Sequence, residues 1–211
     1  YMVQFEDRTE FVATDGFRLS LQSIIGKNIL EVGEGMILSS RLIQELLSLK
    51  TTESIHLYVH KESNQVLFET PEVVLVGRLI EGEYPPYQRV IPNEKETTVT
   101  LDKDEFHQIV KLAAVFARES SNIVKLNIDK GTFSLSAKSS GVGSAVSSMT
   151  GEQEGSDNYV SFNVKYLIDF LRIVESKEIL LEMKNSLEPV VFRELKNESF
   201  LHVIMPVRVQ D

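Results

Sequence analysis

Two similar stretches decide the fold of this chain: RLIQELLSL at residues 41–49 and KYLIDFLRI at residues 165–173. They begin 124 positions apart, and at this offset the first residues are both basic, an acidic residue aligns with an acidic one, and the apolar positions coincide. The match continues downstream, where VLF at 66–68 aligns with VVF at 190–192. A repeat of this length exceeds a solenoid unit of about 20 to 50 residues. It predicts two similar domains in tandem.

Each repeat combines an amphipathic helix with alternating strands. The apolar residues of 41–49 recur with the 3.6-residue period of a helix, and Ser39 or Ser40 can cap its N-terminus. Asn163 can cap the second helix in the same way. Residues 54–59 alternate polar and apolar side chains, as a half-buried strand does, and the second repeat shows the same alternation. The pattern predicts an α+β fold with helices packed on one face of antiparallel sheets.

A polar segment separates the two repeats. Residues 92–96 read Pro-Asn-Glu-Lys-Glu, a composition typical of a linker. We therefore expect a first domain over residues 1–92, a linker over 93–98 and a second domain over 99–211.

The second domain is expected to open with a helix at about 102–118, followed by strands near 122–129 and 131–138. Residues 139–148 are mostly Ser, Gly and Ala, which is typical of a mobile loop. The GVG sequence at 141–143 is a weak candidate for a phosphate-binding loop, because it does not lie between a strand and a helix. Flexibility is the simpler interpretation.

The expected helix at 102–118 presents three faces on a helical wheel. The residues expected to face the sheet are Phe106, Ile109, Val110 and Ala113. A stripe of basic residues consists of Lys103, His107, Lys111 and Arg118. This stripe is either an ordinary solvated face or a surface for phosphates. A lateral apolar patch of Leu112, Val115 and Phe116 either packs beneath a loop or contacts another subunit.

The composition limits the possible functions. The 211 residues include 31 acidic and 22 basic side chains, which gives a formal charge of −9, and there is no Cys. The lack of Cys excludes disulfides, thiolate zinc sites and a cysteine nucleophile, and it favours the cytosol. No apolar run approaches the roughly 20 residues of a membrane span, so we expect no membrane partner. The net charge argues against a nucleic-acid binder but does not tell where the charges lie.

Signals for catalysis and metal binding are weak. His56 and His60 share a strand face without a third ligand nearby, so a surface pair is a better interpretation than a zinc site. No nucleophile elbow, P-loop or HExxH motif occurs in the sequence. We therefore expect no enzyme, metal or cofactor, and a hydrolase with an unrecognised site is the alternative from another class.

Three motifs carry more particular information. The first is ATDGFRL at 13–19, whose Asp-Gly pair is typical of a turn between strands. The second is RLIEGEYPPYQRVIP at 78–92, and the third is HVIMPVRV at 202–209. Together, and in this order, they resemble the bacterial sliding clamp, the beta subunit of DNA polymerase III.

The resemblance implies a DNA-clamp fold and a processivity factor without catalytic activity. Subunits of that family have three similar domains, and two subunits close head to tail as a homodimeric ring around duplex DNA. Tyr1 lies within an expected strand, so we expect that N-terminal sequence is missing here. The resemblance implies that the missing part is the first domain and the beginning of the second. The fragment should then be largely monomeric.

The resemblance also implies a groove between the second and third domains that binds short linear motifs of replicative and repair polymerases and of a clamp loader subunit. The groove residues that it implies here are Thr14, Gly16, Phe17, Arg18, Leu19, Pro92, Tyr166, Leu187, Pro189, Val203, Met205, Pro206 and Arg208. An apolar cleft with a methionine adapts to varied Leu and Phe side chains. Phe17 stands where His is common in the family, which keeps an aromatic wall but removes a ring donor.

Further roles follow from the same resemblance. The DNA-facing residues that it implies are Arg41, Lys103, His107, Lys111, Arg118, Lys165 and Arg172, which would contact duplex DNA without reading its sequence. Val115 and Phe116 would contact the neighbouring subunit. The expected location is the cytoplasm, in association with the nucleoid. A clamp-like adaptor that binds peptides without encircling DNA is the alternative.

Overall fold

The computed structural model describes residues 1–26, 29–49, 54–119, 121–139, 141 and 143–209. Backbone contacts divide the chain into two compact units. The first unit consists of Tyr1–Val12 and Gln22–Pro85, and the second of Ala13–Leu21 and Pro86–Asp211. Strands β2 (Arg8–Thr14) and β3 (Arg18–Ile25) contribute residues to both units.

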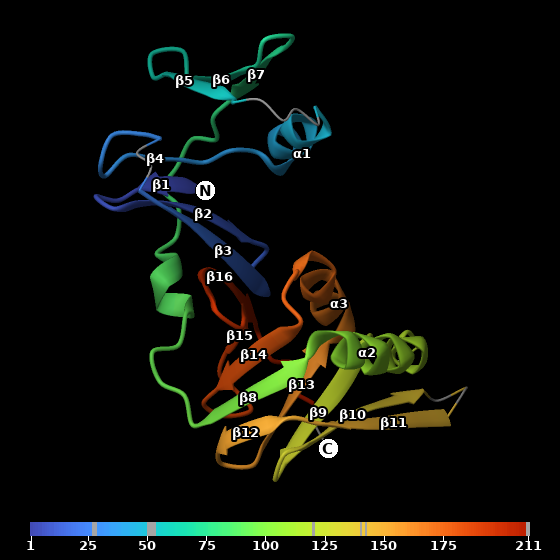
Figure 1. Cartoon of the computed structure of the whole chain (residues 1–211). Helices are drawn as coiled ribbons and strands as arrows, with labels where there is room; N and C mark the ends of the chain where they lie inside the picture. Colours follow the sequence, from blue (N-terminus) through green and yellow to red (C-terminus); the bar gives the residue numbers. More distant parts are fainter. Residues whose placement is uncertain (27–28, 50–53, 120, 140, 142, 210–211) are drawn as a thin grey trace. The chain divides into compact units, whose positions relative to one another are not determined.

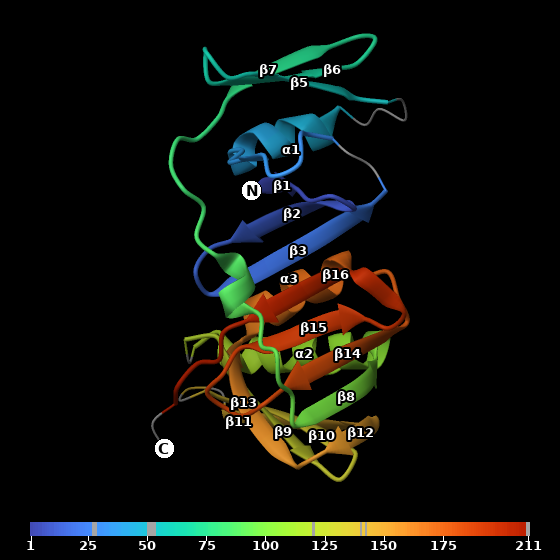
Figure 2. The ribbon, with the colours of Figure 1, turned by 90° about the vertical axis from the view of Figure 1, so that its left-hand side faces the viewer.

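Among its described residues, the first unit has one helix and two groups of strands. Its other elements are β1 (Met2–Gln4), β4 (Gly35–Met36), α1 (Ser40–Ser48), β5 (His56–His60), β6 (Gln65–Glu69) and β7 (Val74–Arg78). Strand β1 pairs antiparallel with β2 and β4, and β5, β6 and β7 form an antiparallel sheet. Helix α1 lies between this sheet and β1 (Figure 2), and Leu42 of α1 is buried with Met2, Met36, Val66 and Phe68.

The described part of the second unit has two helices and two sheets. Its elements after the 3₁₀ turn at Tyr87–Val90 are β8 (Thr97–Asp102), α2 (Lys103–Ala117), β9 (Ile123–Asp129), β10 (Thr132–Ser139), β11 (Gly143–Thr150), β12 (Glu152–Gly155), β13 (Asn158–Asn163), α3 (Val164–Ile173), β14 (Glu178–Met183), β15 (Val190–Glu194) and β16 (Asn197–Ile204). One sheet has the order β11-β10-β9-β13, and the other has the order β12-β8-β14-β15-β16, followed by the first residues of β3. Helices α2 and α3 lie side by side (Figure 1), and α2 also packs on β10 and β11.

The core of the second unit lies between these helices and the two sheets. The aromatic side chains of Phe106 on α2 and Phe170 on α3 are fully buried, together with Phe133, Phe162 and Phe192 from the strands. The arrangement is the α+β architecture that the sequence predicts, with helices on antiparallel sheets.

The predicted helices and their caps are present. Helix α1 begins after Ser39, whose side chain accepts a hydrogen bond from the Leu42 amide, and α3 begins after Asn163, whose side chain accepts one from the Lys165 amide. Helix α2 follows Asp102, which caps it by accepting from the Glu105 amide. These short polar side chains satisfy N–H groups that have no partner inside the helix.

One prediction about the backbone is wrong. Residues 143–148, expected within a mobile loop, belong to β11, which pairs with β10 from Ser139↔Gly143 to Thr132↔Thr150. In β11 only Met149 is buried, so the strand lacks the apolar alternation that would have indicated it. Gly143 of the GVG sequence begins this strand, whereas Ser140 and Val142 lie outside the described residues.

The contact-defined units differ in detail from the predicted domains. Residues 13–21 belong to the second unit although they lie early in the sequence. Part of the expected linker at 93–98 is already in a sheet, because β8 begins at Thr97 and the Glu96 amide donates to the Met183 carbonyl. The limits of the predicted domains stay a prediction.

Candidate functional site

The turn between β2 and β3 is held by its own side chains. The Thr14 hydroxyl donates to the Arg18 carbonyl at 2.7 Å and accepts from the Gly16 amide at 3.1 Å. Asp15 Oδ1 accepts from the amides of Phe17 and Arg18, each at 3.0 Å. Gly16 has φ of +85°, a conformation that side chains with a Cβ rarely adopt. The ATDGFRL motif therefore encodes one tight and specific turn.

The carboxyl of Asp15 is kept ionised by this turn. Burial acts to raise its pKa, but the amides of Phe17 and Arg18 and the Arg18 side chain outweigh burial and lower the pKa below its usual value. The turn thus places a permanent negative charge beside Arg18.

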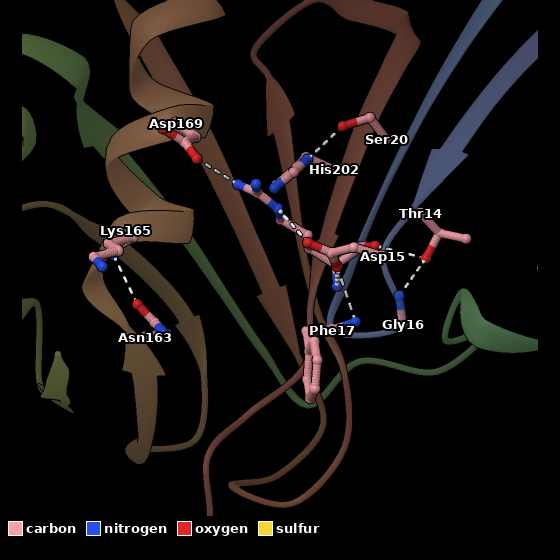
Figure 3. A network of polar contacts seen from close by, with 10 residues as sticks. Thr14, Asp15, Gly16, Phe17, Ser20, Asn163, Lys165, Asp169 and His202 are labelled. Carbon is pink, nitrogen blue, oxygen red and sulfur yellow. Dashed lines mark hydrogen bonds and ion pairs between the residues drawn. The ribbon is translucent and has the colours of Figure 1, made fainter. Parts of the chain in front are cut away.

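Arg18 is the centre of the site. Its Nε lies 3.1 Å from Asp15 Oδ2, and its Nη1 lies 2.7 Å from Asp169 Oδ2 on α3. The guanidinium carbon lies 4.6 Å from the centroid of the Tyr166 ring, in the geometry of a cation–π contact. Figure 3 shows Asp15 from the turn and Asp169 from the helix converging on this point.

Aromatic and C-terminal residues lie next to Arg18. The rings of Phe17 and Tyr166 are stacked, with centroids 6.5 Å apart. The Met205 amide donates to the Phe17 carbonyl at 2.8 Å, which fixes the segment after β16 against the turn. The Phe17 side chain is 62% exposed, so an apolar surface is open to a partner at this point.

A hollow of about 370 Å³ adjoins Arg18. Its walls combine Thr14, Asp15 and Ser20 with Phe170 and Ile173 of α3 and His202 of β16. Thr14 and Arg18 are groove residues that the sequence predicts, whereas Asp15, Ser20, Asp169, Phe170, Ile173 and His202 were missed. Asp15 lies inside the ATDGFRL motif, and Asp169 aligns with Glu45 in the repeat, so the sequence contains a feature that could have identified each of them.

His202 forms the inner wall of this hollow. Its Nδ1 lies 2.7 Å from Ser20 Oγ, and its ring stacks on Phe170 with centroids 5.4 Å apart. Burial, assisted by the charge of Arg18, lowers the pKa of His202 to about 4, so the ring is neutral at pH 7. Its Nε2 is buried and has no hydrogen-bond partner among the described residues.

The structure divides the predicted groove residues into three groups. Contacts described above join Thr14, Gly16, Phe17, Arg18, Tyr166 and Met205. Leu19 and Val203 are buried in the core, where they support the site by packing. The third group lies outside this contact network and is half-buried or exposed; its members are Pro92, Leu187, Pro189, Pro206 and Arg208.

The predicted DNA-facing residues differ in solvent exposure and in whether their charges are paired. Exposed basic residues on or beside the helices are Arg41, Lys111, Arg118, Lys165 and Arg172. Arg41 lies on α1 of the first unit, and the other four belong to the second unit. Lys103 is half-buried, and its Nζ lies 3.2 Å from Asp104 Oδ1.

His107 differs from the other residues of the predicted basic stripe. Burial lowers the pKa of its imidazole, and the charges of Lys111 and Lys103 lower the pKa further, with a contribution from Arg172 on α3. The ring is therefore neutral near pH 7 and adds no positive charge. The same effect indicates that α2 and α3 gather basic side chains around His107.

The lateral patch on α2 has an open and a covered part. Val115 is 59% exposed and Leu112 is 49% exposed, whereas Phe116 packs partly against the core. Leu112 and Val115 are thus available for a contact with another chain, and their assignment to a subunit interface stays a prediction.

The described residues contain neither a candidate metal site nor a helix that could span a membrane. No group of three or more His, Asp or Glu side chains there could hold a metal ion. Among these residues, no helix is both long enough and apolar enough to cross a membrane.

Comparison with known proteins explains the arrangement. The family model for the DNA polymerase III beta subunit, central domain, matches residues 2–86, and the model for its C-terminal domain matches residues 88–208. The beta sliding clamp of Staphylococcus aureus is 28% identical over 198 residues, which cover 93% of this chain and 52% of that protein. This chain therefore spans about half the length of the curated relatives it matches.

Solved structures agree with this result. The DNA polymerase III beta subunit of Thermotoga maritima is 29% identical with a TM-score of 0.91, and the match covers 99% of this chain and 57% of that one. The DNA polymerase sliding clamp of Bacillus subtilis is 25% identical with a TM-score of 0.92, and the match covers 99% and 56%. With both domain models matched in order along nearly all its residues, the chain belongs to the DNA polymerase III beta subunit family and carries the central and C-terminal domains of that family.

Proposed function

We propose that this chain is the peptide-docking part of a DNA sliding clamp, a processivity factor that has no catalytic activity of its own. One observation supports this most strongly. The exposed ring of Phe17 and the ring of Tyr166 lie beside the guanidinium of Arg18, which two carboxylates already hold in place. Such a surface offers apolar contact and a charged group together, as a recognition site for short peptides requires.

The partner is a short linear motif with Leu and Phe side chains, carried by replicative and repair polymerases and by a clamp loader subunit. Burying one such apolar side chain contributes about 1.5 to 3 kcal/mol. Ordering each flexible side chain costs about 0.5 to 1.5 kcal/mol, so two anchors alone supply at most about 5 kcal/mol, which corresponds to a Kd on the order of 0.1 to 1 mM. Met205 adapts to the shape of the inserted side chain. Phe17, in place of the more common His, favours apolar partners because its ring has no N–H donor.

The basic residues of α2 and α3 are proposed to face duplex DNA inside a ring of two subunits. Lys111, Arg118 and Lys165 can attract phosphates without reading bases, which a sliding ring requires. A chain with a net charge of −9 can do this because only the local charge at the contact matters. A protein with this role works at the chromosome, so we expect it in the cytoplasm with the nucleoid.

Titration with a labelled peptide containing a Gln-x-Leu-Phe motif tests the docking function. We expect saturable binding, with the largest NMR shifts at Phe17, Tyr166 and Met205, and no binding by a peptide with Ala at the Leu and Phe positions. Equal binding of both peptides, or shifts confined to other residues, would contradict the proposal. Closure around circular DNA by a subunit with the full length of the matched relatives distinguishes a clamp from an adaptor that only binds peptides.

A further inference from the structure

Asp169 connects the ATDGFRL turn to helix α3. Its Oδ2 accepts from Arg18 Nη1 at 2.7 Å across 151 positions of sequence, and its Oδ1 lies 3.6 Å from Arg172 Nη1, one turn further along the helix. Asp169 is not among the groove residues that the sequence predicts. Its side chain is 45% exposed, so it lies at the surface beside the docking site.

The two carboxylates around Arg18 restrain it differently. Asp15 belongs to the same turn and meets Nε, the nitrogen nearest the side-chain stem. Asp169 belongs to a different element and meets Nη1, at the far end of the guanidinium. A planar group held at one nitrogen can still rotate, whereas two contacts on different nitrogens fix its plane. That plane rests on the ring of Tyr166, at 4.6 Å.

A second cation, Arg172, approaches Asp169 at Oδ1 at 3.6 Å, whereas Oδ2 accepts from Arg18 at 2.7 Å. His202 is neutral, so it offers no second cation behind Arg18. Arg18 Nη2 has no partner among the contacts of the described residues, and its two N–H groups remain for a ligand. The contact of Asp169 with Arg18 therefore leaves one edge of the guanidinium available.

We propose that Asp169 is a positioning residue: it holds the Arg18 guanidinium flat on Tyr166, with the Nη2 edge directed to a docked peptide. This inference rests on the proposed docking function. A simple structural salt bridge is the competing interpretation, and a pair of this exposure contributes little to stability. We therefore expect a change at Asp169 to weaken peptide binding while leaving the free energy of unfolding nearly unchanged.

A double-mutant cycle tests whether Asp169 acts through Arg18. Peptide affinity is measured for the unaltered chain, Arg18→Ala, Asp169→Ala and the double variant. We expect Asp169→Ala to weaken binding about fivefold, and the double variant to bind like Arg18→Ala alone. Asp169→Glu keeps a carboxylate and should retain most of the affinity, and Arg172→Ala, which removes the other partner of Asp169, is the matched control and should leave the affinity unchanged.

A second readout needs no peptide. In the free chain, the Nε–H resonance of Arg18 should be sharp and slow to exchange, and Asp169→Ala should shift and broaden it while Arg172→Ala does not. The inference is overturned if Asp169→Ala leaves the affinity unchanged, if it leaves this resonance unchanged, or if it weakens binding equally with and without Arg18. Failure of the unaltered chain to bind the peptide would contradict both the docking function and this inference. Binding that Asp169→Ala does not alter would contradict this inference alone.

Discussion

The ring of His202 lies on the ring of Phe170 with 5.4 Å between centroids and 18° between planes, and this contact buries an ionisable group in an apolar stack. His202 on β16 and Phe170 on α3 thereby join the last strand of the second unit to the helix that carries Tyr166 and Asp169. The packing of α3 on β16 at this point depends on keeping this imidazole neutral, because burial disfavours its charged form.

Stability should fall as the pH is lowered between about 6.5 and about 4. The unfolded imidazole takes up a proton near pH 6.5, whereas burial lowers the folded pKa to about 4, so the unfolded state binds more protons within this window. The loss is on the order of 3 kcal/mol at most. Urea unfolding at several pH values measures it.

His202→Gln is the comparison for this prediction. It should remove most of the pH dependence in that window. Asp15, Glu182 and Glu194, whose pKa values are lowered in the fold, begin to lose their contributions as the pH falls through the unfolded values of 3.8 for Asp and 4.5 for Glu, at the acidic end of this window. If the free energy of unfolding depends on pH in the same way for the unaltered chain and for His202→Gln, the assignment to His202 is contradicted.

Gly77 permits the close packing of α1 on β7 in the first unit. A Cβ at this position would lie 2.5 Å from Leu42 Cδ2, and Leu42 is buried. We expect Gly77→Ala to lower the free energy of unfolding by about 1 to 3 kcal/mol through overpacking. Gly141→Ala is the control, because a Cβ there would meet only the flexible carboxylate of Glu119 at 3.1 Å. Equal unfolding midpoints for the two variants would refute the packing account.

The basic face of α2 and α3 should support movement on DNA. In a subunit with the full length of the matched relatives, changing Lys111, Arg118 and Lys165 to Glu should shorten the products of processive synthesis and weaken salt-dependent DNA binding. Lys196→Glu, on the exposed hairpin between β15 and β16, is the control for a change of charge. Normal processivity of the triple variant would leave these residues as an ordinary solvated face.

The 211-residue chain should be largely monomeric at micromolar concentration. Two family domains are matched here, whereas a closed ring needs the contact between the third domain and the first domain of a neighbour that the resemblance implies. Light scattering checks the mass, and a stable closed dimer would contradict this expectation.

The helices and the family could be predicted from the sequence because their signals are local. The apolar period and the polar caps Ser39 and Asn163 specify α1 and α3 without knowledge of tertiary contacts. Strand β11 could not be predicted, because seven of its eight residues are not buried and its neighbour β10 supplies the pairing. Leu47, counted in the apolar stripe of α1, is 74% exposed, since periodicity does not tell how wide the covered face is.

The chemistry of the site was only partly predictable for the same reason. The motif ATDGFRL indicates the turn and Arg18, but the second carboxylate of Arg18 comes from a residue 151 positions away. His107 has a basic residue's place on the helical wheel, yet burial and the nearby charges of Lys111 and Lys103 keep it neutral. Such effects depend on tertiary packing, which spacing in the sequence does not reveal.

The affinity of a Gln-x-Leu-Phe peptide for the chain with both Arg18→Ala and Met205→Ala tests the central claim most directly. Removing the guanidinium and the adaptable apolar side chain should weaken binding at least about tenfold relative to the unaltered chain, while Lys196→Ala leaves it unchanged. An affinity equal to that of the unaltered chain would contradict the assignment of the docking site.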